Sequence, residues 1–408
     1  MTTELEQIRI DTADLAIGMF VCGLDRPWEE TQFPLQGLEV RTDDDVRLLR
    51  ELCKFVFIDR RREVLIGRRR LLTLARSDRR EASFKRATTY ADTIGVREEI
   101  PKAREAMRAT SELLDRIYED IASGRPLSVE YVEQVVRPLV ASVLRSVDAF
   151  LFLEGLRRHD NYTYSHAISC GALAAAFGRH LGLPEDTILS LATGGLLMDI
   201  GKTQLPEKLL RQPGPLRARE IEQVRTHVAQ GLEIVTSGGI HDPDVLDVVR
   251  THHERYDGSG YPDGLTGNTI PMAGRMLAII DSYDAMCSVR PHRKALPRHK
   301  ALQEIYRARD TLYQGELVEQ FQVCLGVYPT GSRVELSSGE VAVVMEQNQV
   351  RRLRPTVLVI SSTDKQPLEK FRMLDLLNQT DDEARVEIQR GLAIDEYDID
   401  TSGFLTAA

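Results

Sequence analysis

The chain has 408 residues, and its 53 Lys and Arg stand against 62 Asp and Glu, so the formal net charge is −9. This acidic balance argues against a protein that binds DNA, and no apolar run approaches the ~20 residues that a membrane-spanning helix needs. The length suits two or three domains. Because the first residues lack a secretory signal and the five cysteines are scattered, we expect a cytoplasmic protein with reduced thiols.

Residues 1–62 predict a small α+β module. Short β-like runs occur in it, and Thr42 followed by Asp45 is a capping-box pattern that opens a helix. Residues 63–140 are expected to form a basic linker and connecting helices, because 60–80 hold nine arginines and only two acids. Such a run favours a solvated connector, and a partner-binding strip is the alternative.

Residues 141–326 predict a helical domain, since apolar residues recur at three- and four-residue spacing, as in Ala167, Cys170 and Ala174. From 327 to 408 the pattern alternates and turns on glycines, which predicts a short β-rich appendage. The fold class expected for the whole chain is therefore mainly α, with a small α+β module before the helices and strands after them.

All nine histidines follow residue 158, and two isolated carboxylates lie in strongly apolar surroundings. A buried carboxylate is costly unless a cation or several hydrogen-bond donors compensate it. Helical bundles build metal sites from imidazoles and carboxylates that converge from several helices. We therefore favour a metal site over separate structural roles for six residues, namely His166, His227, His252, His253, Asp199 and Asp281.

The string HHERYDGSGYPDGL, residues 252–265, resembles the signature of the HD-GYP family, a subset of the HD superfamily of metal-dependent phosphohydrolases. The segments DNYTYSH, DIGK, THVAQG, IIDSYDAM and RPHRKAL follow the rest of that family's pattern in order, over roughly residues 145–325. The N-terminal segments LAIGMFVCGLDRPW and FPLQG resemble, more loosely, an uncharacterised domain that often precedes HD-GYP domains.

The resemblance implies two divalent metal ions, iron, manganese or similar. The second metal would be held by Asp199 as a bridge with His227, His252 and His253, and the first by His166, Asp199 and Asp281. The family's remaining first-metal ligand is a histidine, and Met198 stands in its place. Because a thioether is a weak, soft ligand, we expect the first site to be weakened and only partly occupied. Tyr162 occupies the position from which a Glu holds a third metal in some relatives, so at most two metals are expected.

The implied activity is hydrolysis of cyclic di-GMP to linear pGpG, to GMP, or to both. By the same resemblance, Asp199 and Lys202 are catalytic, and the expected substrate contacts are Lys202, Tyr261, Arg290 and Arg293. Relatives also use the GYP loop, here DGSGYPDGL at residues 257–265, to dock diguanylate cyclase (GGDEF) domains.

The alternative is a catalytically lapsed domain that binds cyclic di-GMP or a cyclase, because the loss of one ligand at Met198 could empty the first site. A homodimer formed through the helices is compatible with either hypothesis, and the metal, the product and the signal read by the N-terminal module stay open.

Overall fold

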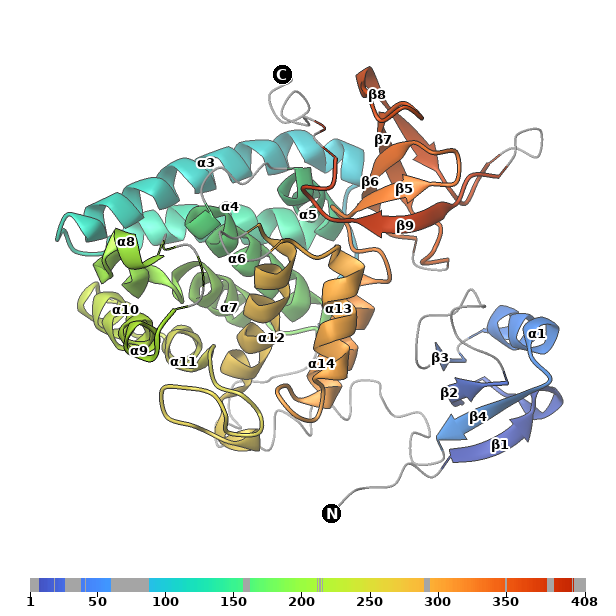
Figure 1. Ribbon diagram of the computed structural model, residues 1–408, viewed down its shortest axis with the longest axis horizontal. Coiled ribbons are helices and arrows are strands. Elements are labelled where there is room, and N and C mark those ends of the chain that lie inside the picture. Colours follow the sequence, from blue (N-terminus) through green and yellow to red (C-terminus); the bar gives the residue numbers. More distant parts are fainter. Residues whose placement is uncertain are drawn as a thin grey trace. The chain divides into compact units, whose positions relative to one another are not determined.

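The computed structural model describes residues 7–17, 19–25, 38–40, 42–59, 88–156, 162–210, 212, 214, 216–289, 294–348, 351–379, 385–397 and 399. The chain separates into two compact units, Met1–Ser83 and Phe84–Ala408 (Figure 1). The arginine-rich stretch at 60–80 lies outside the described residues. Among the described residues, none of the helices combines the length and apolar character needed to cross a bilayer.

In its described residues, the first unit is a small antiparallel sheet with the α-helix α1 and a short 3-10 turn, η1 (Thr12–Asp14). The capping box expected at the start of this helix is present, since the Thr42 hydroxyl accepts from the Asp45 N–H and the Asp45 carboxylate accepts from the Thr42 N–H. The strand order is β1-β4-β2-β3, so the predicted α+β module is confirmed. Its elements are β1 (Gln7–Asp11), β2 (Phe20–Leu24), β3 (Leu38–Glu39), α1 (Asp43–Leu52) and β4 (Phe55–Asp59).

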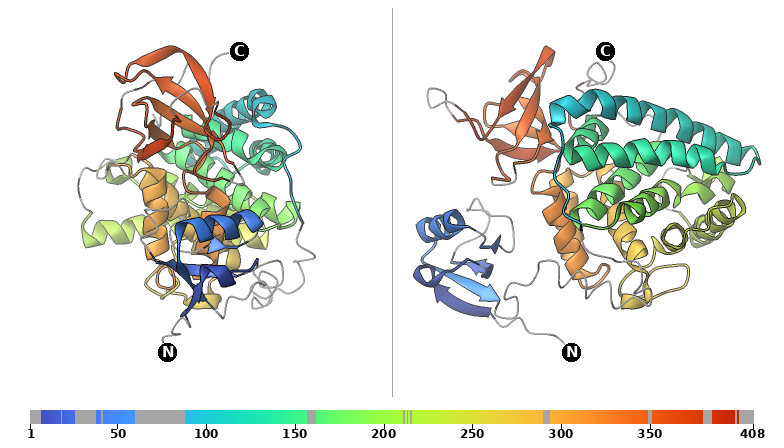
Figure 2. Two further views of the ribbon diagram at one scale, coloured as in Figure 1. Left: turned by 90° about the vertical axis from the view of Figure 1, so that its right-hand side faces the viewer. Right: turned by 180° about the vertical axis from the view of Figure 1, so that it is seen from behind.

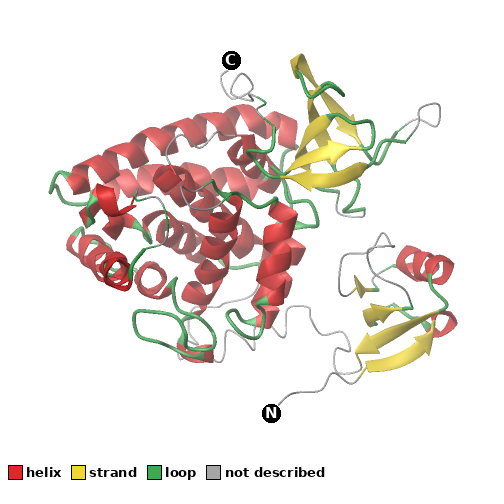
Figure 3. Ribbon diagram, in the orientation of Figure 1, coloured by secondary structure: helices red, strands yellow, loops and turns green. Residues whose placement is uncertain are grey.

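The second unit begins with a helical bundle, which confirms the mainly α class (Figure 3). Helices α3 and α4 run side by side (Figure 2). They occupy the later part of the segment 63–140, and α4 continues beyond it to Arg145. They are joined by the buried Glu99 carboxylate, which accepts from the Arg145 guanidinium and the Ser142 hydroxyl. The helices are α3 (Val96–Ala122), α4 (Val129–Arg145), α5 (Val147–Leu156), α6 (Tyr162–His180), α7 (Glu185–Leu197), α8 (Glu207–Leu210), α9 (Ala218–Arg225), α10 (His227–Ser237), α11 (Pro243–Thr251), α12 (Met272–Cys287), α13 (Arg298–Arg307) and α14 (Gly315–Leu325), with 3-10 turns η4 (Ile200–Gln204) and η5 (Gly267–Thr269).

The chain then forms a five-stranded antiparallel sheet in the order β8-β7-β6-β5-β9, which confirms the predicted β-rich appendage. The central strands β6 and β7 are almost wholly buried and rich in Val and Ile, as expected for strands covered on both faces. The strands are β5 (Arg333–Leu336), β6 (Val341–Glu346), β7 (Thr356–Ser361), β8 (Pro367–Asp375) and β9 (Ile388–Leu392).

Helix α5 carries the contacts that hold this sheet. The buried Asp148 carboxylate accepts from the Thr330 hydroxyl at 2.5 Å and from the Gln347 N–H at 2.9 Å. A Cβ atom on Gly155 would lie 2.3 Å from the Cα of Gly331, so the helix and the loop before β5 approach at a distance that only glycine allows. The sheet is therefore packed firmly against the helix that precedes α6.

Asp148 predicts a pH dependence of stability. Burial, the largest influence, raises the pKa of its carboxyl from 3.8 to about 6. Between these values the folded state binds a proton that the unfolded state has lost, so stability falls as pH rises through this window. We compare the free energy of unfolding of the Asp148→Asn variant with that of the natural chain. The variant's value minus the natural value is expected to be about 3 kcal/mol larger at about pH 7 than at about pH 3.5. Urea unfolding at both pH values measures this difference, and an equal difference at both would contradict the argument.

Candidate metal centre

Five helices, or the segments directly after them, bring together all six residues expected to bind metal. His166 lies on α6, and Asp199 immediately precedes η4 at the end of α7. The other four are His227 at the start of α10, His252 and His253 directly after α11, and Asp281 on α12. Residues up to 115 positions apart in the sequence thus meet in one place, from His166 to Asp281.

Glycines on both sides of Asp199 permit this convergence. A Cβ atom on Gly195 would lie 2.9 Å from the backbone carbon of Cys170 on α6, and one on Gly201 would lie 2.0 Å from the carbonyl oxygen of His227. Any larger residue would push these segments apart. The segment that carries Asp199 therefore lies directly against the elements that carry His166 and His227.

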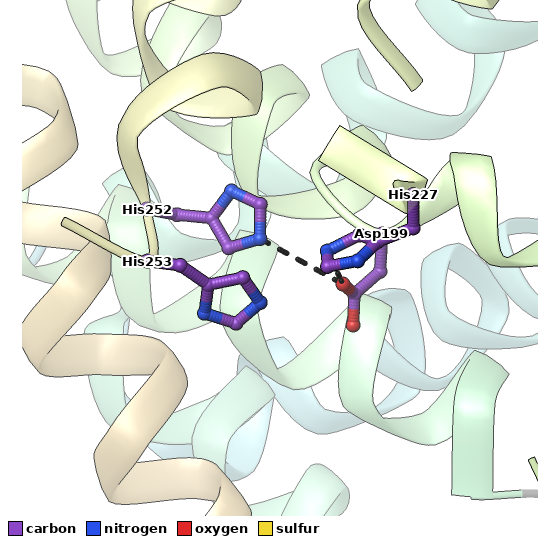
Figure 4. Close-up of side chains that lie close together, drawn as sticks. All are labelled: Asp199, His227, His252 and His253. Carbon is purple, nitrogen blue, oxygen red and sulfur yellow. Dashed lines mark ion pairs between the residues drawn. The ribbon is translucent and has the colours of Figure 1, made fainter. Parts of the chain in front are cut away.

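Three buried polar atoms face one another in the second group of expected ligands (Figure 4). Asp199 Oδ1 lies 3.4 Å from His227 Nε2 and 3.7 Å from His252 Nε2. None of these three atoms has a hydrogen-bond partner. A buried polar atom without a partner costs free energy, so three that converge on one point indicate a cation between them. The nearby His253 completes a group of four potential ligands.

The other ring nitrogens explain why these imidazoles face inward. His227 Nδ1 lies 2.6 Å from the Val224 carbonyl oxygen, and His252 Nδ1 lies 3.1 Å from that of Val248. Each Nδ1 is therefore assigned the hydrogen and donates it, which leaves the lone pair of Nε2 directed toward Asp199. Neutral imidazoles with a carboxylate are a donor set that fits divalent iron, manganese, cobalt or zinc.

The first group of expected ligands surrounds His166. Its Nε2 atom lies 3.2 Å from Asp281 Oδ1 and 3.6 Å from Asp199 Oδ2. Asp199 thus presents one oxygen to each group, the arrangement expected of a bridging ligand. His166 Nδ1 lies 2.7 Å from the buried Asp284, a residue that the sequence analysis did not single out. Met198 is completely buried.

The electrostatics of the site favour a carboxylate beside neutral imidazoles. Burial alone would raise the pKa of Asp199, but Lys202 and the three nearest histidines outweigh it and hold that pKa well below its usual value. Burial lowers the pKa of His227 to about 4, and it also lowers the pKa of His253. The imidazoles of His227 and His253 are therefore neutral at pH 7, which is the form that binds metal.

Two of the expected substrate contacts, Lys202 and Tyr261, lie beside this group. Lys202 Nζ is 2.5 Å from Asp199 Oδ2, and its side chain is 22% exposed. The Tyr261 ring lies 4.6 Å from the His253 ring, and the Arg225 guanidinium lies over Tyr261 at 4.8 Å. Arg225 was missed by the sequence analysis, although its place two residues before an expected ligand was a usable signal. Arg290 and Arg293 lie outside the described residues.

Glu254 organises the GYP loop and was also missed. Its buried carboxylate accepts from the backbone N–H groups of three consecutive residues at 2.8, 3.1 and 3.0 Å. These residues are Asp263, Gly264 and Leu265. Its position directly after the two adjacent histidines gave no sign of this role, because the three donors lie nine to eleven residues further on.

Replacing Glu254 by alanine is expected to loosen the loop. Three backbone N–H groups would lose a charged acceptor, so we expect a loss of about 2–3 kcal/mol of stability and faster amide exchange at residues 263–265. Hydrogen exchange followed by mass spectrometry measures the second effect. Glu133→Ala, on the exposed surface of α4, is the control. Unchanged amide exchange in Glu254→Ala would show that the order of the loop does not depend on Glu254.

Comparison with known proteins gives matches along most of the chain. Residues 151–317 match the family model of the HD domain, and residues 7–132 match that of a domain of unknown function, DUF3391. A cyclic di-GMP phosphodiesterase of Pseudomonas aeruginosa is 31% identical over 386 residues, which are 91% of this chain and 90% of that protein.

Two further relatives match over less than half of this chain and less than half of their own length. A cyclic di-GMP phosphodiesterase of Thermotoga maritima is 35% identical over 40% of this chain and 44% of its own length. A 3′3′-cGAMP-specific phosphodiesterase of Vibrio cholerae is 32% identical over 38% of this chain and 29% of its own length.

Proposed function

Because the chain belongs to the HD-GYP family of metal-dependent phosphohydrolases, we propose that it hydrolyses a 3′–5′ phosphodiester bond of cyclic di-GMP. Linear pGpG is the product of the first cleavage, and GMP that of a second. The observation that carries the proposal is the convergence of three unpartnered buried atoms, on Asp199, His227 and His252. The relatives named for cyclic di-GMP and for 3′3′-cGAMP support the wider substrate class.

The residues present fit two divalent metals. Asp199, His227, His252 and His253 would hold the second, while Asp199 with His166 and Asp281 would hold the first. Bound there, the metals would lower the pKa of a water molecule and neutralise the phosphate that it attacks. The protein itself orients the imidazoles of both sites. The Asp284 carboxylate contacts His166, and backbone carbonyls of α9 and α11 contact His227 and His252.

Three side chains are proposed to bind the dinucleotide. Lys202 supplies a partly exposed ammonium group beside the centre, suited to a phosphate oxygen. Tyr261 is in contact with His253, and Arg225, whose side chain is 42% exposed, covers its ring. The guanidinium plane, supported by the ring, suits the two acceptor atoms on the edge of a guanine base. Arg290 and Arg293 remain proposed contacts of the dinucleotide. The GYP loop remains a proposed docking surface for diguanylate cyclases.

The test is anaerobic hydrolysis of cyclic di-GMP, with metal content measured on the same samples. Met198→His is compared with the natural chain. Turnover by the natural chain with about two metals bound would support the proposal. Turnover only by Met198→His, with a metal gained, would favour the lapsed domain that binds the nucleotide without cleaving it. The complete burial of Met198, which offers no imidazole, is the observation behind that second candidate.

A further inference from the structure

A buried ion pair is connected to the first group of ligands. The guanidinium of Arg298, at the start of α13, donates to Glu154 Oε2 on α5 at 2.6 Å. The two side chains are only 14% and 6% exposed. Another guanidinium nitrogen donates to the backbone carbonyl of Thr330, in the loop before β5, at 3.4 Å. One arginine thus joins α5, α13 and the start of the C-terminal sheet.

The second oxygen of Glu154 reaches α6. Glu154 Oε1 accepts from the Ser169 hydroxyl at 2.6 Å, and both side chains are buried. Ser169 follows His166 by three residues, so the two lie about one turn apart on one face of α6. Glu154 therefore holds the turn of α6 that carries His166.

Arg298 also shares a cavity with the carboxylate that orients His166. Its walls include Arg298, Glu154, Asp284 and Ser288, and its volume of about 20 Å³ has room for one water molecule. Asp284 Oδ2 lies 2.7 Å from His166 Nδ1, and the Ser288 hydroxyl donates to the same oxygen at 3.4 Å. Both routes to His166, through α6 and through Asp284, therefore lead back to Arg298.

The competing interpretation is an ion pair that only stabilises the fold. A buried ion pair is a weak stabilising device, because removing two charges from water can cost as much free energy as their attraction supplies. Apolar side chains of the same size would fill the space equally well. Here both oxygens of Glu154 are engaged, one by the arginine and one by Ser169, which fixes the distance between three elements. The arrangement therefore favours a role in geometry.

We propose that Arg298 is a positioning residue for the first metal. Through Glu154 and Ser169 it holds the turn of α6 that bears His166. Across the shared cavity its positive charge attracts the Asp284 carboxylate, which keeps the imidazole ring in place. The inference rests on the proposed function, because it needs the first metal to be bound, but metal binding tests it without turnover.

The experiment measures manganese(II) binding to the full-length protein by electron paramagnetic resonance of the free ion. Arg298→Met, which removes the charge but keeps a long side chain, is compared with the natural chain, and Arg298→Lys restores the charge. Arg145→Met is the matched control, because Arg145 forms the same kind of triplet with Glu99 and Ser142, between α3 and α4. His166→Ala removes a ligand of the first metal and so identifies which manganese ion that site holds.

We expect Arg298→Met to weaken binding of the first manganese by about 10-fold or more, with the second unchanged, and Arg298→Lys to recover part of this loss. Arg145→Met should lower stability in urea but leave both affinities unchanged. Ser169→Ala keeps the ion pair and should weaken the same ion. If circular dichroism shows that Arg298→Met does not fold, Ser169→Ala provides the test in its place. Unchanged affinities in these variants, or equal weakening of both ions, would overturn the inference.

Failure of this inference is distinguishable from failure of the proposed function. A natural chain that binds two manganese ions without hydrolysing cyclic di-GMP would contradict the proposed function alone. A natural chain that binds only one manganese ion would overturn the inference, because no first metal is then held. Hydrolysis by that chain would leave the proposed phosphodiesterase activity standing.

Discussion

Asp199→Asn is expected to abolish both metal binding and hydrolysis, with kcat/KM lower by about 10³-fold or more. Asp199 Oδ1 faces His227 and His252, while Oδ2 faces His166 and Lys202. An amide has one oxygen and no charge, so it leaves one group without its ligand and sets an N–H₂ group against a cation. Elemental analysis and steady-state kinetics measure the two losses.

The matched control is Asp186→Asn, which changes an exposed carboxylate at the start of α7, the helix that precedes Asp199. It should leave metal content and kcat/KM unchanged. Retention of both metals and of activity in Asp199→Asn would show that this carboxylate is not a ligand shared by the two metals. Circular dichroism separates a lost site from a lost fold.

Lys202→Ala is expected to lower kcat/KM by about 100-fold while the metals stay bound. Its ammonium group lies against Asp199 Oδ2 and is 22% exposed, so it stands between the buried ligands and the solvent from which a phosphate arrives. Loss of this cation removes charge stabilisation for the phosphate but no metal ligand. Steady-state kinetics and metal analysis on the same preparation measure the lower kcat/KM and the retained metal content.

Lys202→Arg keeps the charge and should recover part of the activity, whereas Lys208→Ala, at an exposed position on α8, should have no effect. A fall in metal content in Lys202→Ala would instead show that Lys202 only positions Asp199. It would then be removed from the proposed substrate contacts.

Much of the site could be predicted because its ligands lie in short segments with strong local signals. The adjacent His252 and His253, the isolated Asp199 and Asp281 in apolar runs, and the glycines of the GYP loop each have a meaning that needs only neighbouring residues. The helical spacing before and after them, and the β alternation near the C-terminus, are equally local. These patterns agree with the structure because none of them depends on contacts between distant parts of the chain.

The sequence by itself determined the mainly helical class and the set of imidazoles and carboxylates that converge. Only the tertiary structure decided that Asp284 orients His166 across 118 positions, that Arg225 covers Tyr261, that Glu254 holds the GYP loop and that Cys170 lies against His166. The physical reason is that these contacts depend on how closely separate backbone segments approach. Around Asp199, glycines set that approach: a Cβ atom added to Gly201, for example, would lie 2.0 Å from the carbonyl oxygen of His227. No pattern within one segment encodes it.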